Sequence, residues 1–174
     1  AMMIDSGNNW LLKNAALIDH TSLMDIFIQG EHIQSIGANL KPAPETQVLD
    51  LEGRLVIPGF VDAHMHLDKS FALDSGLEAS DTLEGAIAAF FKWGEDVSPE
   101  LIYQNARKVA ELALVHGTIA LRTHVMVYLE RSHEWLDALI RAREAMSPWL
   151  EIQLAILPDA VVFNDPDGNK IIRA

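Results

Sequence analysis

Short apolar segments separated by turn residues fill the first third of the chain. Each segment is only long enough for a strand, and glycine or proline occupies the intervals between them. Gln29, Gly30 and Glu31 join the second segment to the third, which predicts a β-hairpin. We therefore expect a small β-layer, with strands over residues 10–18, 24–30 and 31–37 and a strand on either side of Gly53 within 48–59.

The pattern changes after Pro58 and Gly59 to longer apolar strands that alternate with helical periodicity. Residues 60–68 are nearly all apolar, which predicts a strand buried on both faces. An order of strand, helices, strand, helix and strand predicts a parallel sheet with helical crossovers. The further strands are expected over residues 118–127 and 151–157, and the helices over 80–94, 98–117 and 132–146.

Capping residues predict where the first two helices begin. Asp81 and Glu84 have the spacing of a capping box at the start of the first helix. Ser98 is the expected N-cap of the second helix, Pro99 its first helical position, and Gly117 lies just past its end.

Composition excludes several kinds of site and partner. The net charge is −12 and the 13 basic residues do not cluster, which argues against nucleic acid. The absence of cysteine excludes disulfides, thiolate ligands and cysteine nucleophiles, and it is compatible with the reducing cytoplasm, the location we expect. No apolar run approaches the ~20 residues that cross a bilayer, so no membrane contact is expected. A small-molecule substrate remains the simplest partner.

His64 and His66 stand at the end of the apolar strand 60–68. Residues two apart on a strand point to the same side, roughly 6.6–7 Å apart along it. A Zn–N bond of roughly 2.0–2.1 Å allows two such rings to share one metal ion. In a parallel barrel, the C-terminal strand ends form the active-site face. Two structural histidines in a sheet are the alternative, because an HxH pattern alone is weakly specific.

The segment VIPGFVDAHMHLD, residues 56–68, closely resembles the opening motif of the amidohydrolase superfamily. TLEGAIAAFFKW, HGTIALRTHV and SPWLEIQLAILPD resemble successive segments of its cytosine deaminase branch, and HLDKSF resembles the triazine-degrading aminohydrolases. The resemblance implies an α/β fold: a small β-sandwich segment over residues 1–57, then over 58–174 the start of a (β/α)8 TIM-type barrel, with about three βα units.

The resemblance also implies a chemistry. One divalent metal ion, zinc or iron, would activate a water that attacks an amidine or amide carbon of a cyclic amidine or aminated heterocycle and expels ammonia or an amine. His64 and His66 would supply two of the metal ligands.

Four residues are candidates for contact with the substrate. The resemblance places His124, in LRTHV, at the same mouth as the metal, with a structural histidine as the alternative. Asp159 stands where cytosine deaminases carry a glutamine that contacts the base; an ionised Asp cannot donate as an amide does, which argues against cytosine itself. Lys69 suits an acidic substrate group or a pair with Asp68, although an exposed lysine is commoner. Gln153 alternates with the apolar Leu154 along the expected strand, and this alternation is compatible with a side chain that points to the inside of the barrel.

The family mechanism also needs a later histidine ligand, a glutamate, another histidine and an aspartate on the last strand. The residues after Pro58 leave room for about three of the eight barrel units. We expect this chain to be an incomplete barrel that is inactive alone, and its open sheet edge and apolar face to be covered by self-association or by a missing C-terminal portion. The alternative is a non-catalytic binding or assembly module derived from an amidohydrolase.

Overall fold

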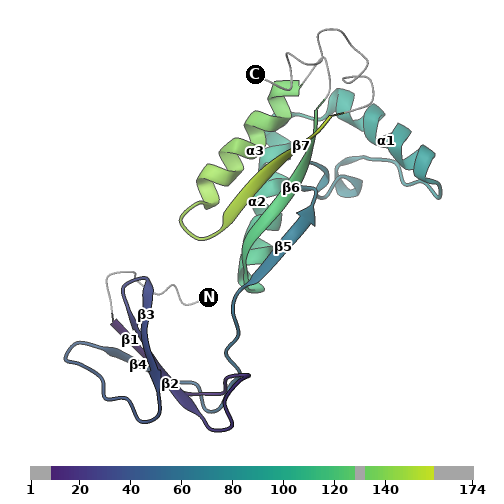
Figure 1. The fold of residues 1–174 in the computed structure, drawn as a ribbon. Coiled ribbons are helices and arrows are strands. Elements are labelled where there is room, and N and C mark those ends of the chain that lie inside the picture. Colours follow the sequence, from purple (N-terminus) through teal and green to yellow (C-terminus); the bar gives the residue numbers. More distant parts are fainter. Residues whose placement is uncertain (1–8, 128–131, 159–174) are drawn as a thin grey trace. The chain divides into compact units, whose positions relative to one another are not determined.

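Two compact units make up the chain, Ala1–Pro58 and Gly59–Ala174. The computed structural model describes residues 9–127 and 132–158, and the helices and strands of both units are drawn in Figure 1. Each unit has its own sheet.

A four-stranded sheet in the order β3-β2-β1-β4 forms the first unit. β2 is antiparallel to both β1 and β3, whereas β4 runs parallel to β1. The predicted hairpin is confirmed, with Gly30 at a φ of 58° in the turn between β2 and β3. The strand expected after Gly53 is wrong, because only a single bridge joins Leu55 to Ala16. The strands are β1 (Asn9–Ala15), β2 (Met24–Gln29), β3 (His32–Gly37) and β4 (Gln47–Asp50).

Asp25 is a buried carboxylate within this first unit. Its two oxygens accept hydrogen bonds from the backbone N–H groups of Asn14, at 3.0 Å, and Leu40, at 2.9 Å. Both oxygens of the buried carboxylate are therefore satisfied by main chain, as burial of a charged group requires. Asn14 has a φ of 57°, so this bond also holds a residue in the left-handed region, which asparagine tolerates.

Three parallel strands in the order β5-β6-β7 form the sheet of the second unit, which confirms the predicted mixture of parallel strands and helical crossovers. Gly59 precedes β5 where the chain passes Ile119, and a Cβ at this glycine would overlap that side chain. The elements are β5 (Phe60–Met65), the 3-10 turns η1 (Leu67–Lys69) and η2 (Leu73–Ser75), α1 (Leu83–Asp96), α2 (Pro99–Val115), β6 (Thr118–Val127), α3 (Ser132–Met146) and β7 (Glu151–Pro158).

The helix starts follow from side-chain caps. Ser98 caps α2, since its hydroxyl accepts a hydrogen bond from the N–H of Leu101 at 3.2 Å, as predicted. The cap of α1 is Thr82, one residue after the predicted Asp81. Thr82 has the extended backbone that an N-cap needs, and its hydroxyl accepts from the N–H of Gly85 at 3.1 Å.

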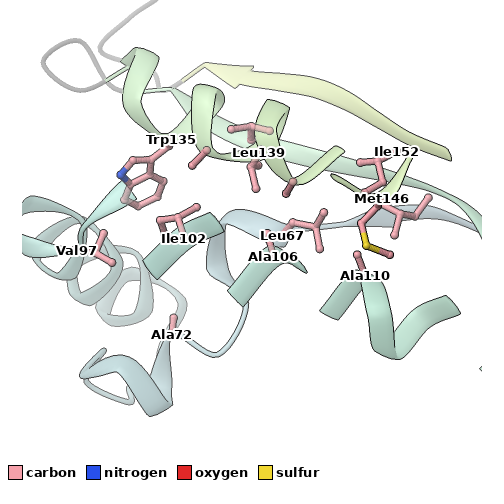
Figure 2. Packing of buried hydrophobic residues seen from close by; sticks show 14 of the residues in the cluster. Leu67, Ala72, Val97, Ile102, Ala106, Ala110, Trp135, Leu139, Met146 and Ile152 are labelled. Atoms are coloured by element: carbon pink, nitrogen blue, oxygen red, sulfur yellow. The ribbon is translucent and has the colours of Figure 1, made fainter. Parts of the chain in front are cut away.

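The hydrophobic core of the second unit lies between the sheet and the helices α2 and α3. Figure 2 shows Ile102 and Ala106 of α2 close to Trp135 and Leu139 of α3, with Leu67 among them. Phe90 and Trp93 of α1 extend the core through ring contacts with Trp135, at centroid distances of 5.6 and 5.8 Å.

Only one face of the sheet is covered by this core. Along β6, the side chains of Leu121, Thr123 and Val125 are buried toward the helices, whereas Arg122 and His124 point to the opposite face. We call that opposite face the open face.

The prediction that residues 60–68 are buried on both faces is wrong. Phe60 and Val61 of β5 are 55% and 68% exposed. The physical reason is position: β5 is an edge strand, and the helices of the described residues pack on β6 and β7, so most of β5 stays exposed on both of its faces.

Candidate functional site

Three histidine rings lie together at the C-terminal ends of β5 and β6. His64 belongs to β5, His66 is the first residue after the end of β5, and His124 lies in β6. The ring centroids of His64 and His124 are 4.3 Å apart and stacked, and His66 lies 5.3 Å from His64 and 5.8 Å from His124. Neighbouring parallel strands end at the same edge of a sheet, and this brings together side chains that are far apart in the sequence.

The ring of His66 is oriented by main chain. Its Nδ1 atom lies 2.9 Å from the carbonyl oxygen of His124. A carbonyl only accepts, so Nδ1 carries the proton and Nε2 keeps a free lone pair. Burial lowers the pKa of His66, and the nearby Lys69 lowers it further. Both effects favour the neutral ring, which is the form that binds a metal ion.

Asp68 is completely buried beside this ring. Its Oδ2 accepts a hydrogen bond from the N–H of Met126 at 2.9 Å. Its Oδ1 lies 3.8 Å from Nδ1 of His66 and has no hydrogen-bond partner among the described residues. Burial raises the pKa of the Asp68 carboxyl, while the Met126 N–H and then Lys69 act in the opposite direction.

Thr123 makes a third contact between β6 and the segment that follows β5. Its buried hydroxyl accepts a hydrogen bond from the N–H of Leu67 at 2.8 Å. With the contacts of His66 to His124 and of Asp68 to Met126, this bond fixes the chain that leaves β5 against the end of β6.

Replacing Thr123 by Val is expected to destabilise the protein by about 1–3 kcal/mol, because the Leu67 N–H would stay buried without an acceptor. Amide hydrogen exchange of Leu67, together with unfolding in urea, measures the effect. Thr123→Ser keeps the hydroxyl and should preserve the protection of that amide. Equal protection of Leu67 in the valine variant would contradict the prediction.

The imidazoles of His64 and His66 fit two positions of a metal site. Neutral imidazole is a ligand suited to zinc and to iron, and the contact of Nδ1 with the His124 carbonyl leaves Nε2 as the nitrogen of His66 that carries a lone pair. In the described part of the chain, no group of three or more His, Cys, Asp or Glu side chains is placed to hold a metal ion. Catalytic zinc usually has three protein ligands, so two imidazoles would make up only part of a catalytic donor set.

Of the four residues predicted to contact the substrate, three lie in the described part of the chain, and only His124 lies in the histidine cluster. His124 stacks on His64, and its buried Nδ1 has no hydrogen-bond partner among residues 9–127 and 132–158. Gln153 is on the open face, where its side-chain oxygen Oε1 accepts a hydrogen bond from the guanidinium of Arg122 at 2.9 Å. Lys69 holds its ammonium 4.7 Å from the ring centroid of Phe90. Asp159 lies outside the described residues.

A largely apolar cavity of 700 Å³ adjoins the site. Met126 connects the two, because it lines the cavity and lies two residues beyond His124 on β6. Most of the remaining wall comes from the turns after β5 and from α1, including Lys69, Phe71, Leu77, Phe90 and Phe91.

The sequence did not predict that Thr123 accepts a hydrogen bond from Leu67, or that Asp68 accepts one from Met126. The only contact suggested for Asp68 was an ion pair with Lys69. The one available indication was the polarity of both residues in otherwise apolar segments. A buried polar side chain at a strand end needs a hydrogen-bond partner, but the sequence does not reveal which one.

No helix in the described ranges is both long enough and apolar enough to cross a bilayer.

A sequence profile described as Amidohydrolase family matches residues 47–159. The chain is 31% identical over 168 residues to N-isopropylammelide isopropyl amidohydrolase of Pseudomonas sp. (strain ADP), a match that covers 94% of this chain and 41% of that enzyme.

Two solved structures share the fold. The 5-methylcytosine deaminase of Klebsiella pneumoniae, liganded with 5-fluorocytosine, superposes with a TM-score of 0.77 at 25% identity, covering 92% of this chain and 39% of that one. Atrazine chlorohydrolase of Arthrobacter aurescens TC1, complexed with zinc, gives a TM-score of 0.65 at 21% identity, covering 84% and 35%. The chain thus spans about two fifths of the length of these proteins.

Proposed function

Because this chain belongs to the amidohydrolase family, in its cytosine deaminase-like branch, we propose that it forms the N-terminal part of a metal-dependent hydrolase of C–N bonds. The substrate is a cyclic amidine or an aminated heterocycle, and the products include ammonia or an amine. The observation that carries the proposal is the cluster of His64, His66 and His124 at the C-terminal ends of two parallel strands. Active sites of barrel enzymes lie at that end of the strands.

In this proposal, His64 and His66 hold one divalent metal ion, zinc or iron, through their imidazoles. When bound, such an ion supplies the Lewis acidity that makes water a nucleophile near neutral pH. His66 coordinates through Nε2, since its Nδ1 is engaged by the carbonyl of His124. His124, whose ring stacks on His64, lines the substrate side of the site, and the apolar cavity beside Met126 excludes water from one side of the substrate.

The three parallel strands are, in the same proposal, the first three of a (β/α)8 barrel, preceded by part of a β-sandwich. The exposed apolar side chains of β5 and β7, which include Phe60, Val61 and Leu157, support this, since they need cover. The cover that we propose is the remainder of the hydrolase, because the matched relatives are more than twice as long as the part of them that aligns with this chain.

The first test is made on the chain itself. Metal content after loading with Zn²⁺ or Fe²⁺ and gel filtration is expected to depend on His64 and His66, and the isolated chain is expected to release no ammonia from heterocyclic amines. Loading that is unaffected by loss of both histidines would count against the proposed ligands.

The second test supplies the remainder of the barrel. A chimera in which this chain replaces the matching 41% of the Pseudomonas relative is assayed for release of ammonia or amine from cytosine, 5-methylcytosine and N-isopropylammelide. We expect turnover that disappears with alanine at His64 and His66.

A binding or assembly module without chemistry is the second candidate. It is favoured by one observation: the described residues contain no group of three potential metal ligands. A chimera that folds and binds metal but releases nothing from any of these compounds would favour this candidate.

A further inference from the structure

Asp68 is a buried carboxylate for which neither the family match nor the proposed chemistry gives a task. It has no exposed surface, and its Oδ2 atom accepts a hydrogen bond from the N–H of Met126. The other oxygen is also buried and has no hydrogen-bond partner among the described residues. An unsatisfied carboxylate oxygen in such a place is costly, so it calls for a partner close by.

The geometry provides one candidate for that partner. Oδ1 of Asp68 lies 3.8 Å from Nδ1 of His66, on the same nitrogen that faces the carbonyl of His124 at 2.9 Å. The carbonyl oxygen is within hydrogen-bond distance of this nitrogen, whereas the carboxylate oxygen is too far for a hydrogen bond and acts on the ring as a nearby negative charge. Both oxygens stabilise the tautomer of His66 that is protonated at Nδ1.

We propose that Asp68 is a positioning residue that holds His66 in the Nδ1-protonated tautomer and in a fixed orientation, so that Nε2 is presented to the metal ion. A histidine ligand commonly donates its second N–H to a carboxylate or a carbonyl, and this contact fixes both the tautomer and the ring. Here the carboxylate is anchored in turn by Met126 on the neighbouring strand, so the orientation of His66 is tied to the end of β6.

The inference rests on the proposed function where it takes His66 as a ligand, but its central statement concerns the tautomer and is measurable without metal. Long-range ¹H–¹⁵N correlation spectra separate rings protonated at Nδ1 from rings protonated at Nε2. They are recorded on the metal-free chain at about pH 8, where ordinary histidines are neutral. The His66 signals are assigned with the His66→Ala variant.

Asp68→Asn is the decisive variant. Its amide oxygen can still accept from the Met126 N–H, whereas its NH₂ group would meet the Nδ1–H of His66 donor to donor. We expect a larger Nε2-protonated fraction at His66 and a zinc affinity lower by about 10–100-fold. If this variant does not fold, Asp68→Ser, which has a smaller neutral acceptor, is compared in the same way.

Asp25→Asn is the matched control. Asp25 is likewise buried and accepts two backbone N–H groups, but it belongs to the first unit. This substitution should change neither the tautomer of His66 nor the affinity for zinc.

Unchanged His66 spectra in Asp68→Asn would overturn the inference, whatever happens to the affinity. A changed tautomer in a protein that binds no zinc, with or without the substitution, would support the role of Asp68 and count against the proposed function instead.

Discussion

Alanine at both His64 and His66 is expected to abolish stoichiometric binding of zinc, with an affinity loss of more than about 100-fold. Loss of a residue that only supports a ligand already costs about 10–100-fold, and here two ligands themselves are removed. Of the three clustered rings, the double variant keeps only His124, and a single imidazole binds zinc far more weakly than several ligands together. Isothermal titration with Zn²⁺, together with metal analysis after gel filtration, measures the loss.

Two matched controls make this result specific. The double variant His20→Ala/His32→Ala removes two exposed histidines of the first unit and should leave zinc binding unchanged. His124→Ala removes a ring but keeps the backbone carbonyl that faces Nδ1 of His66, so its affinity should stay within about tenfold of wild type. A large loss in His124→Ala would instead make that ring a third ligand and contradict the assignment of two.

Replacing Trp135 by alanine is expected to destabilise the protein by about 3–5 kcal/mol, the range for loss of a large buried aromatic side chain. Trp135 is 1% exposed and forms edge contacts with Phe90 and Trp93, so one substitution loosens α3 from α1. Figure 2 shows its ring beside Ile102, toward the end of the core where Val97 lies. Urea unfolding followed by far-UV circular dichroism gives the change in free energy of unfolding.

Trp149→Ala is the control for this experiment. Trp149 is 49% exposed, and its loss should cost under about 1 kcal/mol, as is usual for surface positions. Similar losses at the two tryptophans would mean that the core does not depend on Trp135.

Features set by neighbouring residues could be predicted from the sequence. The hairpin at Gly30 follows from a φ that glycine adopts freely, and the start of α2 follows from the hydroxyl of Ser98. The predicted N-cap of α1, Asp81, is one residue away from the observed one, Thr82. Both residue types are good N-caps, and the choice depends on which of them has the extended backbone that precedes the helix. The pairing of His64 with His66 was likewise readable from a spacing of two.

Features set by contacts between distant segments could not be predicted. Asp68 reaches Met126, and Leu67 reaches Thr123, across more than 50 positions of the chain. The exposure of Phe60 depends on which elements cover β5, and an apolar strand looks the same in the sequence whether it is covered or not. The direct neighbourhood of His124 and His64 was expected only through the family resemblance.

The polar links between β5 and β6 also bear on the order of events during synthesis. All three imidazoles come from β5, the residue that follows it, and β6, so their approach requires one closed crossover and not a closed barrel. Protein domains begin to fold from the N-terminus as they emerge from the ribosome. The histidine cluster can therefore assemble on the growing polypeptide as soon as β6 has paired with β5, before the segments that follow β6 have folded.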